Sequence, residues 1–403
     1  MSFDKRRFEM VEGSSSKFWE ITVEGASLTV TYGRIGTAGT SKTTKTDSAE
    51  EAAAEAAKLI REKTKKGYQE LGATTETYRT PAHIGTSEHV DRFMNYKVVL
   101  FNPEADPEGG ESGMRELPAL RDLDKLVYAV RVGYDDGEEA FGERFTALLA
   151  DPKIGELRGL LIGNWFAEVC EAPPSDAYRR LILNAAKLRS LEGLFLGDVI
   201  QEETEISWLH QDNLAPLLHA LPKLQQLIVR GGEGLRFTKL KHEGLISLTV
   251  QTGGLSSEAV RDLAAAELPN LRRLTLWLGC ENYGGDSTIE DLAPLLSGKR
   301  LPKLEHLGLQ DSEHADEVAA AVATSPILAR LKGLDLSMGT LSDEGAEALL
   351  ASPHIRGLKH LNLRHHYLST GMMTKLRALG IEIDLSDRQE GEEEDDRYIE
   401  VSE

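Results

Sequence analysis

The chain has 403 residues, of which 40% are hydrophobic and 28% charged, so it can form two or three domains with substantial cores and is too apolar to be disordered throughout. Its cysteines, Cys170 and Cys280, lie far apart and follow no metal-ligand spacing, which disfavours a disulfide framework or a zinc site. No apolar stretch is long enough for a signal peptide or a membrane span. We therefore expect a cytoplasmic protein with no membrane contact.

The net charge of −20 is unevenly distributed. Residues 1–80 contain 13 basic and 12 acidic residues, so their net charge is +1 and the rest of the chain carries −21. Because nucleic acids are polyanions, only the first segment has a charge compatible with binding them. Between Asp387 and Glu403, nine of seventeen residues are acidic, which predicts a solvated, disordered tail over 387–403.

The first segment, residues 1–80, predicts a hairpin followed by a helix. Lys17–Val23 and Leu28–Tyr32 alternate apolar and polar residues around a Glu-Gly turn, as two paired strands do. Ser48 and Glu51 have capping-box spacing, and the apolar residues that follow share one helical face. Gly67 would end this helix, and its last turns carry a basic cluster that also suits the helix dipole: Lys58, Arg61, Lys63, Lys65 and Lys66.

Three stretches of this segment occur in the order and spacing of the WGR domain, namely KFWEI at 17–21, YGRIGTAG at 32–39 and KGYQE at 66–70. Over Phe8 to Leu71 the sequence resembles this family, in particular its bacterial branch. In the family's poly(ADP-ribose) polymerase members the motif contacts DNA ends, so the resemblance implies a nucleic-acid site at Lys17, Tyr32, Gly33 and Arg34. Tyr32 stands where the motif has tryptophan, and Ser14-Ser15-Ser16 replaces an asparagine-containing stretch.

The chemistry of those residues is compatible with that implied role. An aromatic ring stacks on any nucleotide, and a guanidinium forms forked hydrogen bonds with phosphate. The alternative is that Tyr32 and Arg34 only stabilise their own domain or face the repeats that follow it.

Residues 81–150 are expected to be a linker and an N-terminal cap. Their acidic, turn-rich piece, 102–113, lies between the apolar strands Tyr96–Phe101 and Leu126–Val132. A stacked-repeat array needs such a cap because its first unit would otherwise expose its core side.

Residues 151–386 contain a repeat. The phrase L-x-x-L-x-[LIV] recurs at intervals of 21 to 34 residues, beginning at Leu157, Leu191, Leu224, Leu245, Leu271, Leu304, Leu331 and Leu358. Helix-like stretches such as Ser256–Ala266 and Ser342–Ala351 separate the phrases. Units of this size bury their apolar faces only by stacking on their neighbours.

Phrases such as LRRLTL at 271–276 and LKHLNL at 358–363 resemble leucine-rich repeats, although the usual asparagine ladder is absent. From about residue 94 the chain also resembles STM4015-like proteins, which occur with WGR domains in bacteria. The expected fold class is α/β. A small antiparallel sheet with a helix would precede a leucine-rich-repeat horseshoe that has a parallel inner sheet and outer helices.

Strand alternation places the residues between the leucines on the concave face. Aromatic and arginine side chains are the commonest energetic centres of protein interfaces. We therefore predict a protein partner on this face, with these contact residues: Phe195, Arg230, Arg273, Trp277 and Arg364.

No nucleotide-binding or catalytic motif accompanies the repeats, so we expect no catalytic residues, no metal and no cofactor. Two hypotheses remain open. The chain is either a non-enzymatic adaptor that joins nucleic acid to a protein partner, or a protein-interaction scaffold that does not bind nucleic acid.

Overall fold

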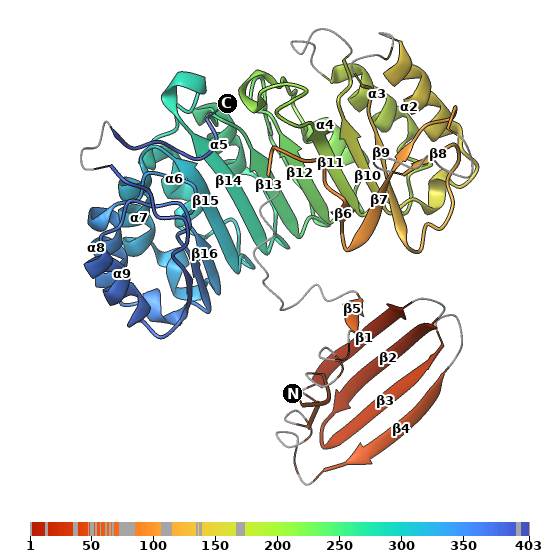
Figure 1. Ribbon diagram of the computed structural model, residues 1–403, viewed down its shortest axis with the longest axis horizontal. Coiled ribbons are helices and arrows are strands. Elements are labelled where there is room, and N and C mark those ends of the chain that lie inside the picture. The colour runs from red at the N-terminus through yellow and green to blue at the C-terminus, as the bar shows by residue number, and fades with distance from the viewer. Residues whose placement is uncertain are drawn as a thin grey trace. The chain divides into compact units, whose positions relative to one another are not determined.

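The computed structural model describes residues 2–12, 15–34, 39–46, 48, 52, 55–56, 58–60, 63, 66, 68–71, 85–105, 115–133, 136, 139–166, 174–391 and 396–402. The chain divides into two compact units, Met1–His83 and Ile84–Glu403, which are described separately (Figure 1). Among the described residues, no helix has both the length and the apolarity that crossing a bilayer requires.

The first unit contains an antiparallel sheet in the order β4-β3-β2-β1-β5. Its strands are β1 (Ser2–Glu12), β2 (Ser15–Glu24), β3 (Ser27–Arg34), β4 (Thr40–Lys45) and β5 (Gln69–Leu71). The predicted hairpin is confirmed as β2 and β3, joined by a tight turn in which Gly25 has φ +57°. Only glycine takes up this left-handed conformation without a steric cost.

A helical segment covers one face of this sheet. Residues 52, 55–56, 58–60 and 63 are helical, and Ala52 N–H donates to Ser48 O, which agrees with a helix that begins at Ser48. Glu51, Arg61, Lys65 and Gly67 lie outside the described residues. The shared core contains strand residues and two helical alanines: Phe8, Trp19, Ile21, Val23, Leu28, Ala52 and Ala56.

The second unit is a sheet of thirteen strands, mostly parallel. They are β6 (Arg92–Phe93), β7 (Tyr96–Phe101), β8 (Glu116–Leu117), β9 (Leu126–Val130), β10 (Gly159–Gly163), β11 (Gly193–Asp198), β12 (Gln226–Arg230), β13 (Ser247–Gln251), β14 (Arg273–Gly279), β15 (His306–Ser312), β16 (Gly333–Asp335), β17 (His360–Asn362) and β18 (Glu382–Asp384). From β9 to β18 each strand pairs in parallel with the next, and among the described strands of this sheet only β6 pairs antiparallel. Residues 92–130 therefore extend the same sheet.

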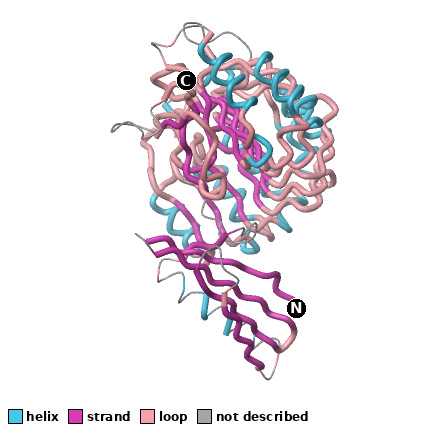
Figure 2. The backbone as a smooth tube through the Cα atoms, turned by 90° about the vertical axis from the view of Figure 1, so that its right-hand side faces the viewer, coloured by secondary structure: helices cyan, strands magenta, loops and turns pink. Residues whose placement is uncertain are grey.

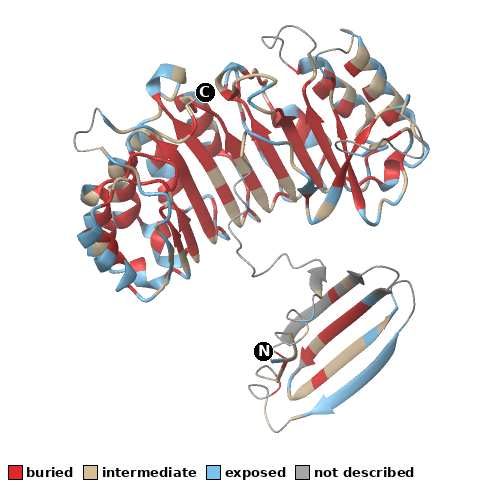
Figure 3. Ribbon diagram, viewed as in Figure 1, coloured by how far each residue is buried: buried red, intermediate tan, exposed pale blue. Residues whose placement is uncertain are grey.

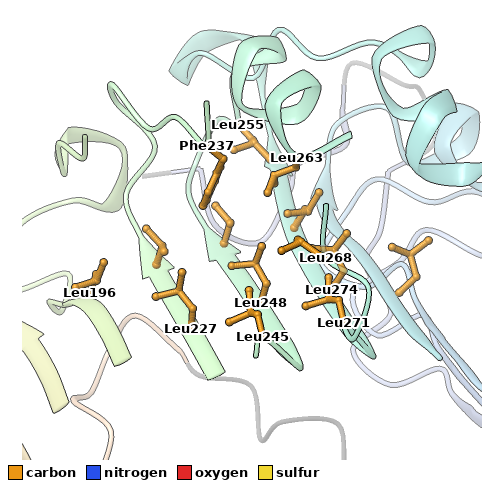
Figure 4. Packing of buried hydrophobic residues seen from close by; sticks show 14 of the residues in the cluster. Leu196, Leu227, Phe237, Leu245, Leu248, Leu255, Leu263, Leu268, Leu271 and Leu274 are labelled. Carbon is orange, nitrogen blue, oxygen red and sulfur yellow. The ribbon is translucent and has the colours of Figure 1, made fainter. Parts of the chain in front are cut away.

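The leucine phrases align in register across this sheet. The second leucine of each phrase pairs with its counterpart in the next strand, from Leu160 through Leu248 and Leu274 to Leu361. These leucines are buried, and Figure 4 shows Leu227, Leu248 and Leu274 among them, packed in one cluster with Phe237 and Leu263. The repeat found in the sequence is thus the core-facing row of strands β10 to β17.

Helices connect most of these strands and pack on one side of the sheet (Figure 2). They are α2 (Ala140–Ala150), α3 (Ser175–Asn184), α4 (Ala215–Ala220), α5 (Ser257–Ala265), α6 (Ile289–Leu296), α7 (Ala315–Thr324), α8 (Asp343–Ala351) and α9 (Thr370–Arg377). The predicted helices at Ser256–Ala266 and Ser342–Ala351 are confirmed, with Ser256 and Ser342 as N-caps. We call the opposite side of the sheet the helix-free face.

Candidate functional site

Lys17, Tyr32, Gly33 and Arg34 come together on the paired strands β2 and β3. Lys17 lies directly opposite Arg34, and Trp19 lies opposite Tyr32. Directly opposed residues, and residues two apart on one strand, share a face, so Lys17, Tyr32 and Arg34 lie on the side that the helical segment covers. All three are exposed, and 49% of Tyr32 is accessible to solvent.

Gly33 does not share the face of Lys17, Tyr32 and Arg34. It pairs with Phe18, so it lies on the opposite face of the sheet. Close by, Gly39 has φ +71°, and a β-carbon there would lie 2.5 Å from Phe18 Cζ and 2.9 Å from Tyr32 O. Gly39 therefore lets the chain pass close to Phe18 and Tyr32, where a side chain would clash.

The helical segment adds cations to this end of the sheet. Lys63 Nζ lies 5.6 Å from the ring centroid of Trp19 and 4.8 Å from that of Tyr68. Burial and the neighbouring charges of Lys66 and Lys17 lower the pKa of Lys63. Because the charge of Lys17 acts on Lys63, the lysines of the helical segment lie near the start of β2. The sequence, which explained these lysines by the helix dipole, did not reveal this proximity.

This end of the sheet therefore combines several positive charges with an exposed aromatic ring. We call the set Lys17, Tyr32, Arg34, Lys63 and Lys66 the basic site. Like charges held this close repel one another and favour an anionic ligand. Lys42 of β4 lies opposite Val30 and so shares the same face, whereas Lys45 lies opposite Ser27 and faces the other side.

Most of the residues predicted to bind a protein partner on the repeats are buried. Phe195 is fully buried on the helix-free face, where it joins a second apolar cluster with Phe93, Leu161 and Ile228. Val90, which precedes β6, also packs against this cluster, and Figure 3 shows the strands as buried. Prediction of Phe195 as an accessible contact was wrong because its partner Phe93 lies about a hundred positions away in the sequence.

Arg230 is also buried. Its guanidinium donates to Gly85 O at 3.1 Å, to Val199 O at 2.5 Å and to Gln251 Oε1 at 3.1 Å. Burial lowers its pKa to about 10, against the charges of Asp198 and Glu203, which raise it. The prediction of an exposed Arg230 was wrong, because its guanidinium is buried where it hydrogen-bonds Gly85 O and links that residue to the sheet.

Trp277 is 2% exposed. Its ring packs with Ile206, Met338 and Val401, and its Nε1 donates to Gln310 Oε1 at 3.1 Å. The prediction of an accessible Trp277 was therefore wrong as well. Val401 belongs to the stretch expected to be a disordered tail, and that expectation fails for residues 396–402, which make defined contacts with the sheet.

The remaining two predicted contacts are partly accessible. Arg364 forms ion pairs with Glu400 and, at 3.1 Å, with Asp387, and 22% of its side chain is exposed. Arg273 is half-buried between Ser247 and His306 on the neighbouring strands. The helix-free face is thus covered in part by the chain's own segments.

His366 of the last repeat hydrogen-bonds backbone groups of the neighbouring loops. His366 Nδ1 accepts from Leu368 N–H at 3.1 Å and its Nε2 lies 3.2 Å from Leu385 O; burial lowers its pKa. Among the residues that the structure describes, no group of three or more histidine, cysteine or carboxylate side chains is placed to hold a metal ion. Cys170 lies outside those residues, and burial raises the pKa of Cys280.

Comparison with known proteins agrees with the two-unit description. The WGR domain model matches residues 5–75. Over 66 residues the chain is 48% identical to the Escherichia coli (strain K12) protein YfeS; this match spans 16% of the chain and 27% of YfeS. A crystal structure of a Bacteroides fragilis protein, from the Northeast Structural Genomics Consortium, is 33% identical with a TM-score of 0.65, covering 99% of this chain and all of that one. The chain therefore belongs to the same family as the Bacteroides fragilis protein, and its residues 5–75 are a WGR domain.

Proposed function

We propose that the protein is a cytoplasmic, non-enzymatic adaptor whose WGR domain contacts nucleic acid, with DNA ends as one target. The observation that supports this proposal most strongly is the basic site, where Lys17 and Arg34 on paired strands meet Lys63 and Lys66 beside Tyr32. Such an arrangement can neutralise several phosphates and stack one base or sugar. The resemblance of the motif at 32–39 to DNA-binding WGR domains supports the same function.

The residues would have separate roles. Arg34 would form forked hydrogen bonds with a phosphate, since a planar guanidinium matches two phosphate oxygens. Lys17, Lys63 and Lys66 would act as point charges along the backbone of the nucleic acid. Tyr32, half of which is exposed, would stack on a terminal nucleotide.

For the second unit we propose a leucine-rich-repeat array of the STM4015-like kind that binds a protein partner. The in-register leucines and the helices on one side support this assignment. Because this unit carries the acidic excess of the chain, a protein is a better partner for it than nucleic acid. The same acidity favours the alternative function, a protein-interaction scaffold without nucleic-acid contact.

A titration of the full chain distinguishes these functions. Fluorescently labelled nicked, blunt and single-stranded DNA would be titrated at two salt concentrations, with polarisation as the readout. We expect binding that weakens with salt. Arg34→Ala and Lys63→Ala should each lower the salt slope by about one, and Tyr32→Ala should weaken binding roughly tenfold.

Lys45→Ala is the matched control, because Lys45 is an exposed lysine on the opposite face of the same sheet. It should bind DNA within about twofold of the wild type, because salt screens a positive charge that lies far from the bound DNA. If the folded wild-type chain binds no DNA at low salt, or if Lys45→Ala matters as much as Lys63→Ala, the scaffold function is favoured instead.

A further inference from the structure

Residues 396–402 lie along the ends of the parallel strands. Tyr398 N–H donates to Tyr367 Oη at 2.8 Å, Glu400 N–H donates to Met338 O at 2.8 Å, and Val401 N–H donates to Asp311 Oδ1 at 3.0 Å. Glu400 pairs with Arg364, and a β-carbon on Gly253 would lie 2.3 Å from Ser402 O. The last part of the chain in Figure 1 follows this edge to the label C.

These contacts come from five consecutive strands. They belong to residues within three positions of the carboxyl ends of β17, β16, β15, β14 and β13, which are Arg364, Met338, Asp311, Trp277 and Gly253. Tyr398 and Glu400 contact residues after β17, Glu400 also contacts Met338 after β16, Val401 contacts Asp311 of β15 and Trp277 of β14, and Ser402 approaches Gly253 after β13. One peptide, residues 398–402, therefore crosses the five strands. We call Arg364, Met338, Asp311, Trp277 and Gly253, with His365 and Tyr367, the strand-end surface.

The strands themselves form the floor beneath this peptide. Trp277 Nε1 donates to Gln310, Gln310 Nε2 donates to Ser337 Oγ at 2.9 Å, and Ser337 Oγ donates to Asp335 Oδ1 at 2.6 Å. Asn362 Nδ2 continues the ladder to Asp335 Oδ2 at 2.9 Å. None of these bonds involves residues 396–402, so the floor is organised by the repeats.

Two features of the strand-end surface suit peptide backbone in particular. Asp311 is fully buried, burial raises its pKa, and one of its oxygens accepts a peptide N–H from Val401. Asp311, Met338 and His365 have φ of 54°, 72° and 56°, a left-handed conformation that non-glycine residues rarely adopt. Rare backbone conformations of this kind concentrate at binding sites.

The peptide lies shallowly on this surface. Val401 is the single buried residue among 396–402, and 71% of Tyr398 is exposed. Asp396 lies in a 3₁₀ turn, and residues 397–402 belong to no helix or strand. Its recognisable chemistry is a carboxylate, Glu400, followed by a small aliphatic side chain, Val401.

We propose that the strand-end surface is a recognition site for an extended peptide of a protein partner that carries a carboxylate followed by a small aliphatic residue, and that residues 396–402 are its displaceable occupant within the chain. This inference deepens the proposed partner binding of the second unit and rests on it. It specifies the class of partner as an acidic-aliphatic peptide bound across strand ends. It does not depend on nucleic-acid contact.

The test uses a fluorescein-labelled peptide with the sequence of residues 396–402 and measures its anisotropy. The wild-type chain should take up little peptide, because its own segment competes at a millimolar effective concentration. A chain that ends at Gly391 should bind the peptide. Peptides with Glu400→Lys or Val401→Asp should bind that chain at least about tenfold more weakly, since each loses a charge-assisted bond or buries a charge.

The Tyr398→Ala peptide is the matched control, because the ring of Tyr398 is exposed and its contacts come from the backbone. It should bind within about threefold of the unmodified peptide. If the shortened chain does not fold, full-length Arg364→Glu replaces it. This variant repels its own Glu400, so it should take up the Glu400→Lys peptide and reject the unmodified one.

Three outcomes would overturn the proposal. One is a folded shortened chain, checked by circular dichroism, that binds no peptide. Another is peptide binding that is indifferent to Glu400 and Val401. The third is a wild-type dimer that disappears when residues 392–403 are removed, because it would assign the surface to a second copy of the chain. Since no DNA is present, none of these results bears on the basic site.

Discussion

The two units use their aromatic residues in opposite ways. In the first unit Tyr32 lies half exposed beside several cations at the end of an antiparallel sheet. In the second unit Trp277 also lies on a sheet face without helices, yet Val401 and Ile206 cover it. Both residues looked like binding residues in the sequence. The difference teaches that alternation identifies the face of a sheet, whereas accessibility depends on which distant segments return to that face.

The largest expected effect comes from removing the covered aromatic. Trp277→Ala should destabilise the second unit by about 3–5 kcal/mol, because it leaves a large cavity and removes the donor to Gln310. Chemical denaturation followed by circular dichroism measures this loss. Trp208→Ala is the matched control, since 53% of Trp208 is exposed, and it should change stability by no more than about 0.5 kcal/mol.

Equal losses of stability on the two tryptophan substitutions would contradict the contrast between a covered Trp277 and an exposed Tyr32. They would show that the Trp277 side of the sheet is open to solvent, as the sequence alone had predicted. Loss of a partner on Trp277→Ala would then report binding, whereas in the structure described here it would report unfolding as well.

The next effect is a pH dependence confined to the second unit. His306 lies on β15, and burial, with the charges of Arg273 and Lys332, lowers its pKa to about 4. Between about pH 6.5 and pH 4 this histidine therefore binds a proton in the unfolded chain but not in the folded chain, so its contribution to stability falls as pH falls. The slope should approach roughly 1.4 kcal/mol per pH unit.

Denaturation midpoints measured from pH 7.5 to 4 test this dependence. The difference in stability between the wild type and His306→Gln should show it, because the substituted side chain does not titrate while other buried groups, such as Asp311 and His366, titrate in both chains. His314→Gln is the control, since 58% of the His314 side chain is exposed. If His306→Gln leaves the pH profile unchanged, burial on the helix-free face does not lower the pKa of His306.

Much of the architecture could be predicted because its cause is local. The leucine phrases identify β10 to β17 since each phrase supplies its own core-facing residues, and the hairpin follows from alternation and one turn. By contrast β4, with the sequence TSKTTK, is exposed along its length and has no apolar signal (Figure 3). It forms because β3 offers a free edge, which no local pattern encodes.

The candidate sites divide in the same way. The pairing of Lys17 with Arg34 follows from the hairpin, which is a local feature. The approach of Lys63 to Trp19 and the contacts of Arg230 with residue 85 and of Val401 with Asp311 join positions from 44 to 145 apart. Such contacts depend on the whole fold, so the sequence predicted the residue types of these sites but neither their cover nor their neighbours.

The smallest expected effect on stability comes from the exposed aromatic. Tyr32→Ala should change the stability of the first unit by no more than about 1 kcal/mol, because half of the ring is already in water and only its packing beside Trp19 is lost. Hydrogen exchange of the β2 and β3 amides measures this unit within the full chain. Tyr32→Phe serves as control and should retain both protection and DNA binding. A residue whose removal weakens DNA binding about tenfold while amide protection persists must act through its exposed surface. A large loss of protection would instead place Tyr32 with Trp277, as a residue that the fold needs.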